Sequence, residues 1–96
     1  MMEQIVIHVT YTCFPGKARE LVQQLKESGA QAAVQAEPGC LQYDYSISCE
    51  APDTVILLEK WKNQAAHDYH MRQPHMRLIA ACKEGRVASM QMERYE

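Results

Sequence analysis

Alternation of hydrophobic and polar residues with a period of two marks three segments of the chain, residues 4–12, 41–48 and 87–94. This period places successive side chains on opposite faces of an extended backbone, so each segment is predicted to be a β-strand. A fourth segment, residues 54–62, is almost continuously apolar and is predicted to be a strand with two buried faces. One amphipathic helix is predicted over residues 18–36, and two short helices over 64–72 and 75–83.

Turn-forming residues separate these segments. Phe14-Pro15-Gly16 ends the first strand, Glu37-Pro38-Gly39 ends the long helix, and Asn63 is expected to cap the next helix. Pro74 separates the two short helices, and Gly85 precedes the last strand. The order β-α-β-β-α-β predicts an α+β ferredoxin-like sandwich with a four-stranded antiparallel sheet. The length of 96 residues suits a single domain spanning residues 1–96.

The faces of the predicted sheet indicate how the chain assembles. Strand 54–62 carries Val55, Leu57, Glu59 and Trp61 on one face and Ile56, Leu58 and Lys60 on the other. Strand 41–48 is expected to present Leu41, Tyr43, Tyr45 and Ile47 together. The helices can cover only one face of the sheet, and Val6 and Val87 are expected to extend the other apolar face. Large exposed apolar surfaces are uncommon on soluble monomers, so a homodimer is predicted.

Charge and composition exclude several classes of partner. Ten basic and twelve acidic residues give a formal net charge of −2, which offers no positive field for a nucleic-acid backbone. No apolar run approaches the roughly 20 residues of a membrane span, and no signal-peptide pattern opens the chain, so a cytoplasmic location is expected. The four cysteines show no C-x-x-C spacing and are expected to be free thiols.

The region most informative about chemistry runs from Glu59 to His75. It holds the only tryptophan, Trp61, and three of the four histidines, His67, His70 and His75. Histidine titrates nearest to neutral pH, and an aromatic wall beside proton-transfer groups suits a small organic substrate. The residue types alone leave open that Trp61 belongs to the core and the histidines to a helix surface. No metal site is predicted, because no H-E-x-x-H or C-x-x-C pattern accompanies the His67–His70 pair.

Four short motifs follow one another along the chain: Pro15-Gly16-Lys17, Glu37-Pro38-Gly39-Cys40-Leu41-x-Tyr43, Glu59-x-Trp61 and His70-x4-His75. In this order they resemble the antibiotic biosynthesis monooxygenase family, and the match extends over nearly the whole chain. The resemblance implies a dimeric α/β barrel, in which two ferredoxin-like sheets meet face to face, with a pocket between each sheet and its own helices. It also implies oxidation of a phenol or quinol by dioxygen without metal or flavin, so no cofactor is expected.

The same resemblance suggests three catalytic residues. Trp61 is expected to form a stacking wall of the pocket, and His70 to act as a general base or proton shuttle. His75 is expected to orient a substrate oxygen near a helix N-terminus. The simpler alternatives are core packing for Trp61 and ordering or capping of a helix for the two histidines.

Three further residues are candidates for contact with the substrate. His8 lies on the strand where haem-degrading relatives carry a polar pocket residue. Tyr43 could line the same pocket, and Glu59, if buried, could act as an acid with a raised pKa. The alternatives are a structural role for His8, core packing for Tyr43 and an ion pair for Glu59.

The sequence therefore favours a cofactor-independent monooxygenase that oxidises a small quinol or phenolic compound. An isomerase of a small phosphorylated carbonyl compound stays open, and it would need Arg72, Arg77 or Lys62 to face the pocket. A non-catalytic dimeric ligand-binding module stays open as well. Haem degradation is disfavoured, because region 79–82, where those relatives carry an iron-binding histidine, contains none.

Overall fold

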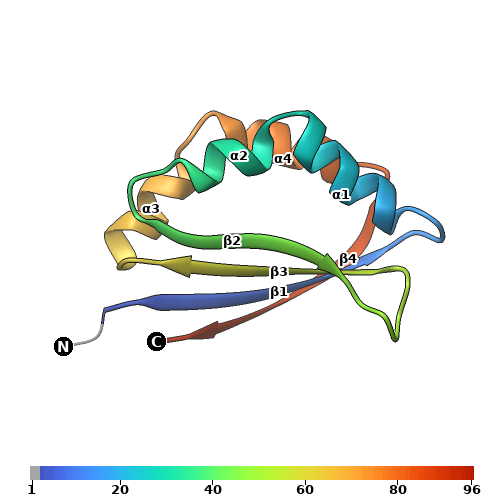
Figure 1. Ribbon diagram of the computed structural model, residues 1–96, viewed down its shortest axis with the longest axis horizontal. Helices are drawn as coiled ribbons and strands as arrows, with labels where there is room; N and C mark the ends of the chain where they lie inside the picture. Colours follow the sequence, from blue (N-terminus) through green and yellow to red (C-terminus); the bar gives the residue numbers. More distant parts are fainter. Residues whose placement is uncertain (1–2) are drawn as a thin grey trace.

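A four-stranded antiparallel sheet with four helices over one of its faces makes up the computed structural model, which describes residues 3–96 (Figure 1). The elements are β1 (Ile5–Cys13), α1 (Ala18–Glu27), α2 (Ala30–Gln35), β2 (Cys40–Ile47), β3 (Thr54–Trp61), α3 (Gln64–Met71), α4 (His75–Lys83) and β4 (Val87–Tyr95). The strands lie in the order β2-β3-β1-β4, which places the first and third strands in the centre. The predicted α+β ferredoxin-like fold is confirmed.

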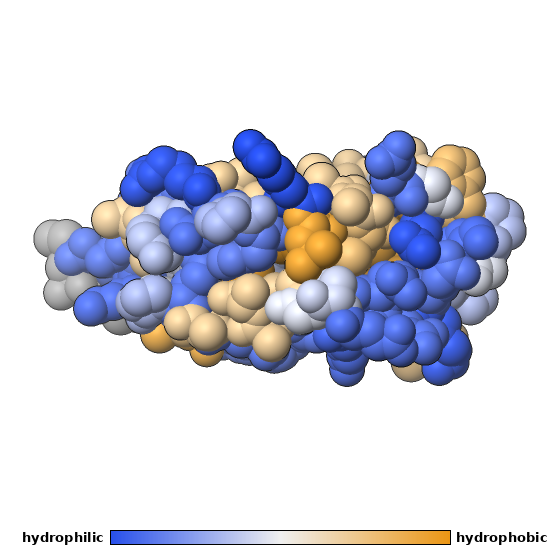
Figure 2. Space-filling model, turned by 90° about the horizontal axis from the view of Figure 1, so that it is seen from above, coloured by the Kyte–Doolittle hydropathy of each residue, from blue (hydrophilic) through white to orange (hydrophobic). Residues whose placement is uncertain are grey.

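The core lies between the sheet and the helix layer. Alternate residues of β1 and β3 are buried because a strand turns every second side chain to the same face. They meet apolar residues of the helices, among them Leu21 and Leu25 of α1 and Val34 of α2, all three almost fully buried. Full burial of each such side chain contributes about 1.5–3 kcal/mol to stability. On the outer surface of the helix layer, hydrophilic side chains surround a small apolar area (Figure 2).

The long helix predicted over residues 18–36 is interrupted, so that expectation was wrong. Gly29 has a φ of 84°, a left-handed conformation that a helix interior does not contain. The hydroxyl of Ser28 accepts a hydrogen bond from the N–H of Ala30 at 3.2 Å and supports the restart of the chain as α2. After this break the chain continues as the short helix α2, whose buried residues are Ala30 and Val34.

Two irregularities in strand pairing change which residues face the core. The register between β2 and β3 shifts between Cys40 and Gln42, and Leu41 is 56% exposed instead of sharing the buried face of Tyr43. The register between β1 and β4 shifts after Thr12, so that Val87 pairs with Cys13 and packs against the core. Val87 therefore does not extend the second face of the sheet, contrary to expectation.

That second face carries the other alternate residues of the central strands. Val6 of β1 and Ile56 and Leu58 of β3 are half-buried there within one chain. The face bears no helix, in agreement with the prediction that helices cover only one side (Figure 1). Among residues 3–96, none of the helices combines the length and apolar character needed to cross a membrane.

Gly39 lies where the loop after α2 approaches helix α3 closely. A Cβ added at Gly39 would overlap the Cβ of Ala66 and stand 3.3 Å from its Cα. Gly39→Ala is therefore expected to destabilise the fold by about 1–3 kcal/mol, as overpacking does elsewhere. Urea unfolding measures the change. Adding Ala66→Gly is expected to recover part of the loss, limited by the roughly 1 kcal/mol that glycine costs in a helix. A Gly39→Ala variant as stable as the parent would contradict the predicted overlap.

Candidate functional site

A cavity of about 190 Å³ lies between the sheet and helices α3 and α4. Its polar lining consists of Tyr11, Tyr43, Glu59, His67, His70 and Lys83. Four methionines contribute much of the apolar lining: Met71, Met76, Met90 and Met92. Met90 and Met92 come from β4, which the helices leave largely exposed, so the cavity is open along that strand.

Glu59 lines the cavity and forms a hydrogen-bonded pair with Trp61. Trp61 is fully buried and is not among the lining residues, so it does not form the expected stacking wall. Glu59 and Trp61 are two positions apart on β3, so both side chains point to the helix side of the sheet. The indole Nε1–H of the fully buried Trp61 donates to Oε1 of Glu59 at 2.9 Å. Burial raises the pKa of the Glu59 carboxyl, and the hydrogen bond from Trp61, which favours the anion, opposes part of the rise. The Glu59 carboxyl can therefore stay protonated at a pH at which an exposed glutamate is ionised.

His70 of α3 stacks on the indole of Trp61, with ring centroids 4.5 Å apart and an interplanar angle of 32°. Its Nδ1 lies 2.8 Å from Oε2 of Glu37, and both side chains are buried. A carboxylate acceptor at Nδ1 favours the tautomer with the proton on that nitrogen. Nε2 has no hydrogen-bond partner within residues 3–96, and His70 lines the cavity. His70 is therefore arranged to accept a proton at Nε2.

Glu37 is a site residue that the sequence analysis assigned only to the end of a helix. Its Oε2 also lies 2.7 Å from Nε2 of His75, so one carboxylate oxygen is shared by two imidazoles. The other oxygen, Oε1, is buried without a hydrogen-bond partner in the described chain. The available signal was the position of Glu37 in the Glu37-Pro38-Gly39-Cys40 motif. His75 does not line the cavity, so it is not placed to orient a substrate oxygen as expected, and its hydrogen-bond contact with this group is to Glu37.

Glu37, His70 and His75 are also the described residues that could hold a metal ion, with one ligand atom from each lying within 4.8 Å of the others. Two imidazoles and a carboxylate suit a divalent transition metal. This group differs from the His67–His70 pair considered from the sequence. Here one nitrogen of each histidine, Nδ1 of His70 and Nε2 of His75, lies at hydrogen-bond distance from the same oxygen of Glu37. The group is therefore arranged as a hydrogen-bonded triad.

His67 of α3 lines the cavity beside His70, with its ring centroid 5.9 Å from that of Trp61. Burial, followed by the neighbouring His70, lowers the pKa of His67. This residue therefore offers a neutral imidazole at the site. The sequence analysis weighed His67 only as a metal ligand.

Tyr43 of β2 packs against the same group of rings. Its ring centroid lies 5.8 Å from that of His70 and 6.4 Å from that of Trp61. The hydroxyls of Tyr43 and Tyr45 are 3.1 Å apart, and burial raises the pKa of both phenols, which keeps them protonated. Tyr43 thus contributes a hydroxyl and an aromatic edge to the lining.

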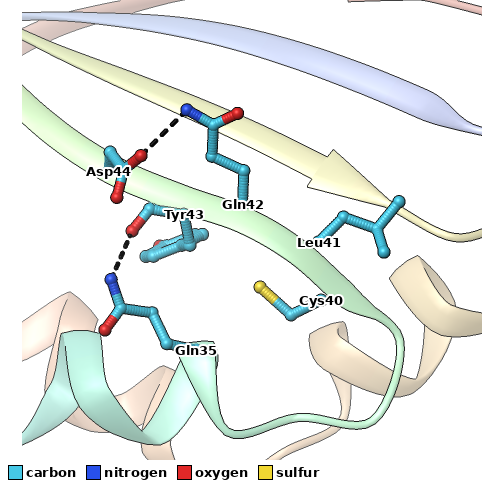
Figure 3. Close-up of a pocket in the computed structure, with 6 residues that line it drawn as sticks. All are labelled: Gln35, Cys40, Leu41, Gln42, Tyr43 and Asp44. Carbon is cyan, nitrogen blue, oxygen red and sulfur yellow. Dashed lines mark hydrogen bonds between the residues drawn. The ribbon is translucent and has the colours of Figure 1, made fainter.

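Helix α2 holds the backbone of Tyr43 at the outer edge of the sheet, where β2 is the last strand. The Tyr43 carbonyl accepts hydrogen bonds from the side-chain amides of Gln31 at 3.2 Å and Gln35 at 2.9 Å. Gln35 also lines a separate hollow of about 260 Å³ along β2, together with Cys40 and Asp44 (Figure 3). Figure 3 shows Gln35 reaching from α2 to the strand. The hydrogen bonds from α2 fix the part of β2 that presents the ring of Tyr43.

His8 lies on the face of the sheet that carries no helix. Its neighbour on the adjacent strand is Glu93, whose Oε1 is 3.7 Å from Nδ1 of His8. His8 is not part of the cavity lining. Lys62, Arg72 and Arg77 are exposed and do not line the cavity either.

Replacing Glu59 with glutamine should change how stability depends on pH. The unfolded chain releases the Glu59 proton near the ordinary pKa of 4.5, whereas the folded chain retains it to higher pH. The contribution of this proton to the stability of the wild type is therefore lost as the pH rises from 4.5 through the raised pKa. Glu59→Gln removes this titration but keeps an oxygen that accepts from Trp61, so its stability relative to wild type should increase over the same window. Urea unfolding between about pH 4 and about pH 7 measures this difference. A difference that stays constant with pH would refute the assignment.

The family model for antibiotic biosynthesis monooxygenase matches residues 4–81 of the chain. YcnE of Bacillus subtilis, a candidate monooxygenase, is 32% identical, and the alignment covers 96% of both chains. YgiN of Escherichia coli K12, a candidate quinol monooxygenase, is 29% identical over 62 residues. That alignment covers 56% of this chain and 60% of the length of the Escherichia coli relative.

A solved structure agrees with the fold described above. The crystal structure of a Pseudomonas aeruginosa protein superposes with a TM-score of 0.84 at 25% sequence identity, covering 99% of this chain and 95% of that one. The similarity therefore extends over all the strands and helices that build the cavity.

Proposed function

Because this chain belongs to the antibiotic biosynthesis monooxygenase family, we propose that it oxidises a small quinol with dioxygen in the cavity between sheet and helices. The observation that carries the proposal is the position of His70. It is stacked on Trp61, bonded to Glu37 through Nδ1, and left with a free Nε2 at a cavity that also contains Glu59. A base and a carboxyl with a raised pKa are the two groups that proton transfer to and from a quinol requires.

The size of the cavity supports a substrate with one aromatic ring. Its volume is about 190 Å³, and an apolar protein cavity of about 150 Å³ is known to accommodate benzene. The methionine side chains of the lining are flexible and polarizable, and such side chains adapt well to aromatic rings. A hydroquinone with a short substituent matches this space.

The proposed roles follow from the contacts of each residue. His70 takes a proton from the quinol through Nε2, and the resulting anion passes an electron to dioxygen. Glu37 stabilises the imidazolium that forms, as a carboxylate does for a histidine base. Glu59 supplies a proton to the departing oxygen, and Trp61 holds the Glu59 carboxyl in place. One oxygen atom enters the ring to give a hydroxyquinone, and the other leaves as water.

We further propose that the chain works as a homodimer. The half-buried Val6, Ile56 and Leu58 form an apolar strip on the sheet face that bears no helix. Covering this strip with a second copy would remove it from water. Sedimentation at micromolar concentration tests the proposal, and a stable single chain would refute it.

The other two functions have less support. An isomerase acting on a phosphorylated compound would need Lys62, Arg72 or Arg77 at the cavity, and none of these lines it. A module that only binds ligands would be expected to have an apolar cavity with its histidines directed to solvent. Here His70 is buried and lines the cavity.

Oxygen uptake with a set of hydroquinones tests the proposed reaction. The expected result is uptake that depends on the protein and exceeds the autoxidation of each quinol. With isotopically labelled dioxygen, one labelled atom is expected in the quinone product. Absence of protein-dependent uptake across the set, or an unlabelled product, would refute the proposal.

A further inference from the structure

We propose that the natural substrate carries an acidic group on a short arm, and that Lys83 binds this group in the cavity. The inference rests on the proposed function for the placement of the ring. It adds a second, separate contact that selects the class of quinol.

Lys83 is the lysine of the cavity lining. It lies in the last turn of α4, is half-buried, and lines the cavity together with Tyr11. Its Nζ stands 5.4 Å from the centre of the Tyr11 ring, within the range of a cation–π contact. Within residues 3–96, no carboxylate oxygen lies within 4.0 Å of this ammonium group. An anion entering the cavity would therefore meet a positioned, unpaired cation.

The register of the sheet places the backbone of Tyr11, whose ring Lys83 contacts, at a different level from that of Glu59. Ile7 pairs with Glu59, and Tyr11 pairs with Val55, so the levels of Glu59 and Tyr11 differ by four residues along the strands. At about 3.3 Å per residue, the two backbone levels are roughly 13 Å apart. The Lys83 side chain bridges part of this separation, because its charge still opposes the rise that burial causes in the pKa of Glu59. The intermediate level is apolar, with Val9 paired to Leu57. The cavity lining thus combines proton-transfer groups, apolar residues and a lysine, a combination that suits a ring with an acidic arm.

A lysine in the last turn of a helix has a simpler role, because positive charge there is favoured by the helix dipole. Lys26 has that position in α1 but lies outside the cavity lining. It therefore serves as a matched control, since both lysines share the dipole and only Lys83 reaches the cavity.

Binding of two related quinols under anaerobic conditions tests the inference without turnover. The probes are 2,5-dihydroxyphenylacetate and its neutral amide, 2,5-dihydroxyphenylacetamide, measured by titration calorimetry. Wild type and Lys26→Met are expected to bind the acid about tenfold more tightly than the amide, as a charge-assisted contact does. Lys83→Met is expected to reduce this preference to about twofold or less, and Lys83→Arg to retain it. Thermal unfolding verifies that each variant is folded.

Equal affinity of the wild type for acid and amide, or failure of both to bind, would overturn the inference. So would a preference that survives in Lys83→Met. The outcome is separable from that of the proposed reaction. Oxygen uptake with neutral hydroquinones together with no acid preference supports the reaction and refutes the role of Lys83. An acid preference that depends on Lys83, without oxygen uptake, supports the role of Lys83 and refutes the reaction.

Discussion

His70→Ala is expected to lower kcat/KM for quinol oxidation by about 10²- to 10⁴-fold, the usual contribution of a positioned general base. The substitution removes the Nε2 that receives the quinol proton and the ring that stacks on Trp61. Most of the loss is expected in kcat, because the base acts on the bound substrate. Initial rates of oxygen uptake over a range of quinol concentrations measure both parameters.

His8→Ala is the matched control, because it removes the same side chain from the opposite face of the sheet. Its kcat/KM is expected to stay within about twofold of wild type, since His8 does not line the cavity. Sedimentation of this variant verifies that the proposed dimer, whose face carries His8, is intact. An equal loss in His8→Ala and His70→Ala would contradict the placement of the reaction in the helix-side cavity. So would full activity in a folded His70→Ala variant.

Glu37→Ala is expected to destabilise the fold by about 2–5 kcal/mol, because each buried donor left without its acceptor costs about 1–3 kcal/mol. The carboxylate bonds both His70 and His75, so its loss leaves two imidazole nitrogens without their acceptor. Urea unfolding at neutral pH measures the change. Glu37→Gln keeps the shape and one acceptor oxygen and should lose less.

Glu27→Ala provides the comparison for Glu37→Ala. Glu27 lies at the end of α1, is exposed, and accepts a hydrogen bond from Gln23 on the surface. Its removal is expected to cost about 1 kcal/mol or less. If Glu37→Ala cost no more than Glu27→Ala, the shared carboxylate would not be the stabilising centre that its contacts indicate.

The fold was predictable from the sequence where periodic patterns extend over many residues. The four strands and the helix over 75–83 follow from such patterns, and the Asn63 cap is confirmed by its side-chain bond to the N–H of Ala66. The break at Gly29 was not predictable in the same way. One residue with a positive φ interrupts an apolar stripe that otherwise continues, and the stripe gives no sign of it.

The bulges and the triad were missed for a different reason. The shifts beside Cys40 and after Thr12 depend on the partner strand, which a pattern along one segment does not contain. Glu37 lies 33 residues from His70 and 38 from His75 in sequence, and no local period links them. The resemblance to a family drew attention to these residues, but only the folded chain brings them together.

The two hydrogen bonds that side-chain amides of α2 donate to the carbonyl of Tyr43 bear on how the chain behaves at high protein concentration. An outermost strand with unsatisfied backbone groups invites a foreign strand to align with it and begin a fibril. Gln31 and Gln35 already occupy that carbonyl in the middle of β2. These two glutamines, which resemble ordinary solvent-facing side chains, thus cover one of the backbone groups with which a foreign strand would pair.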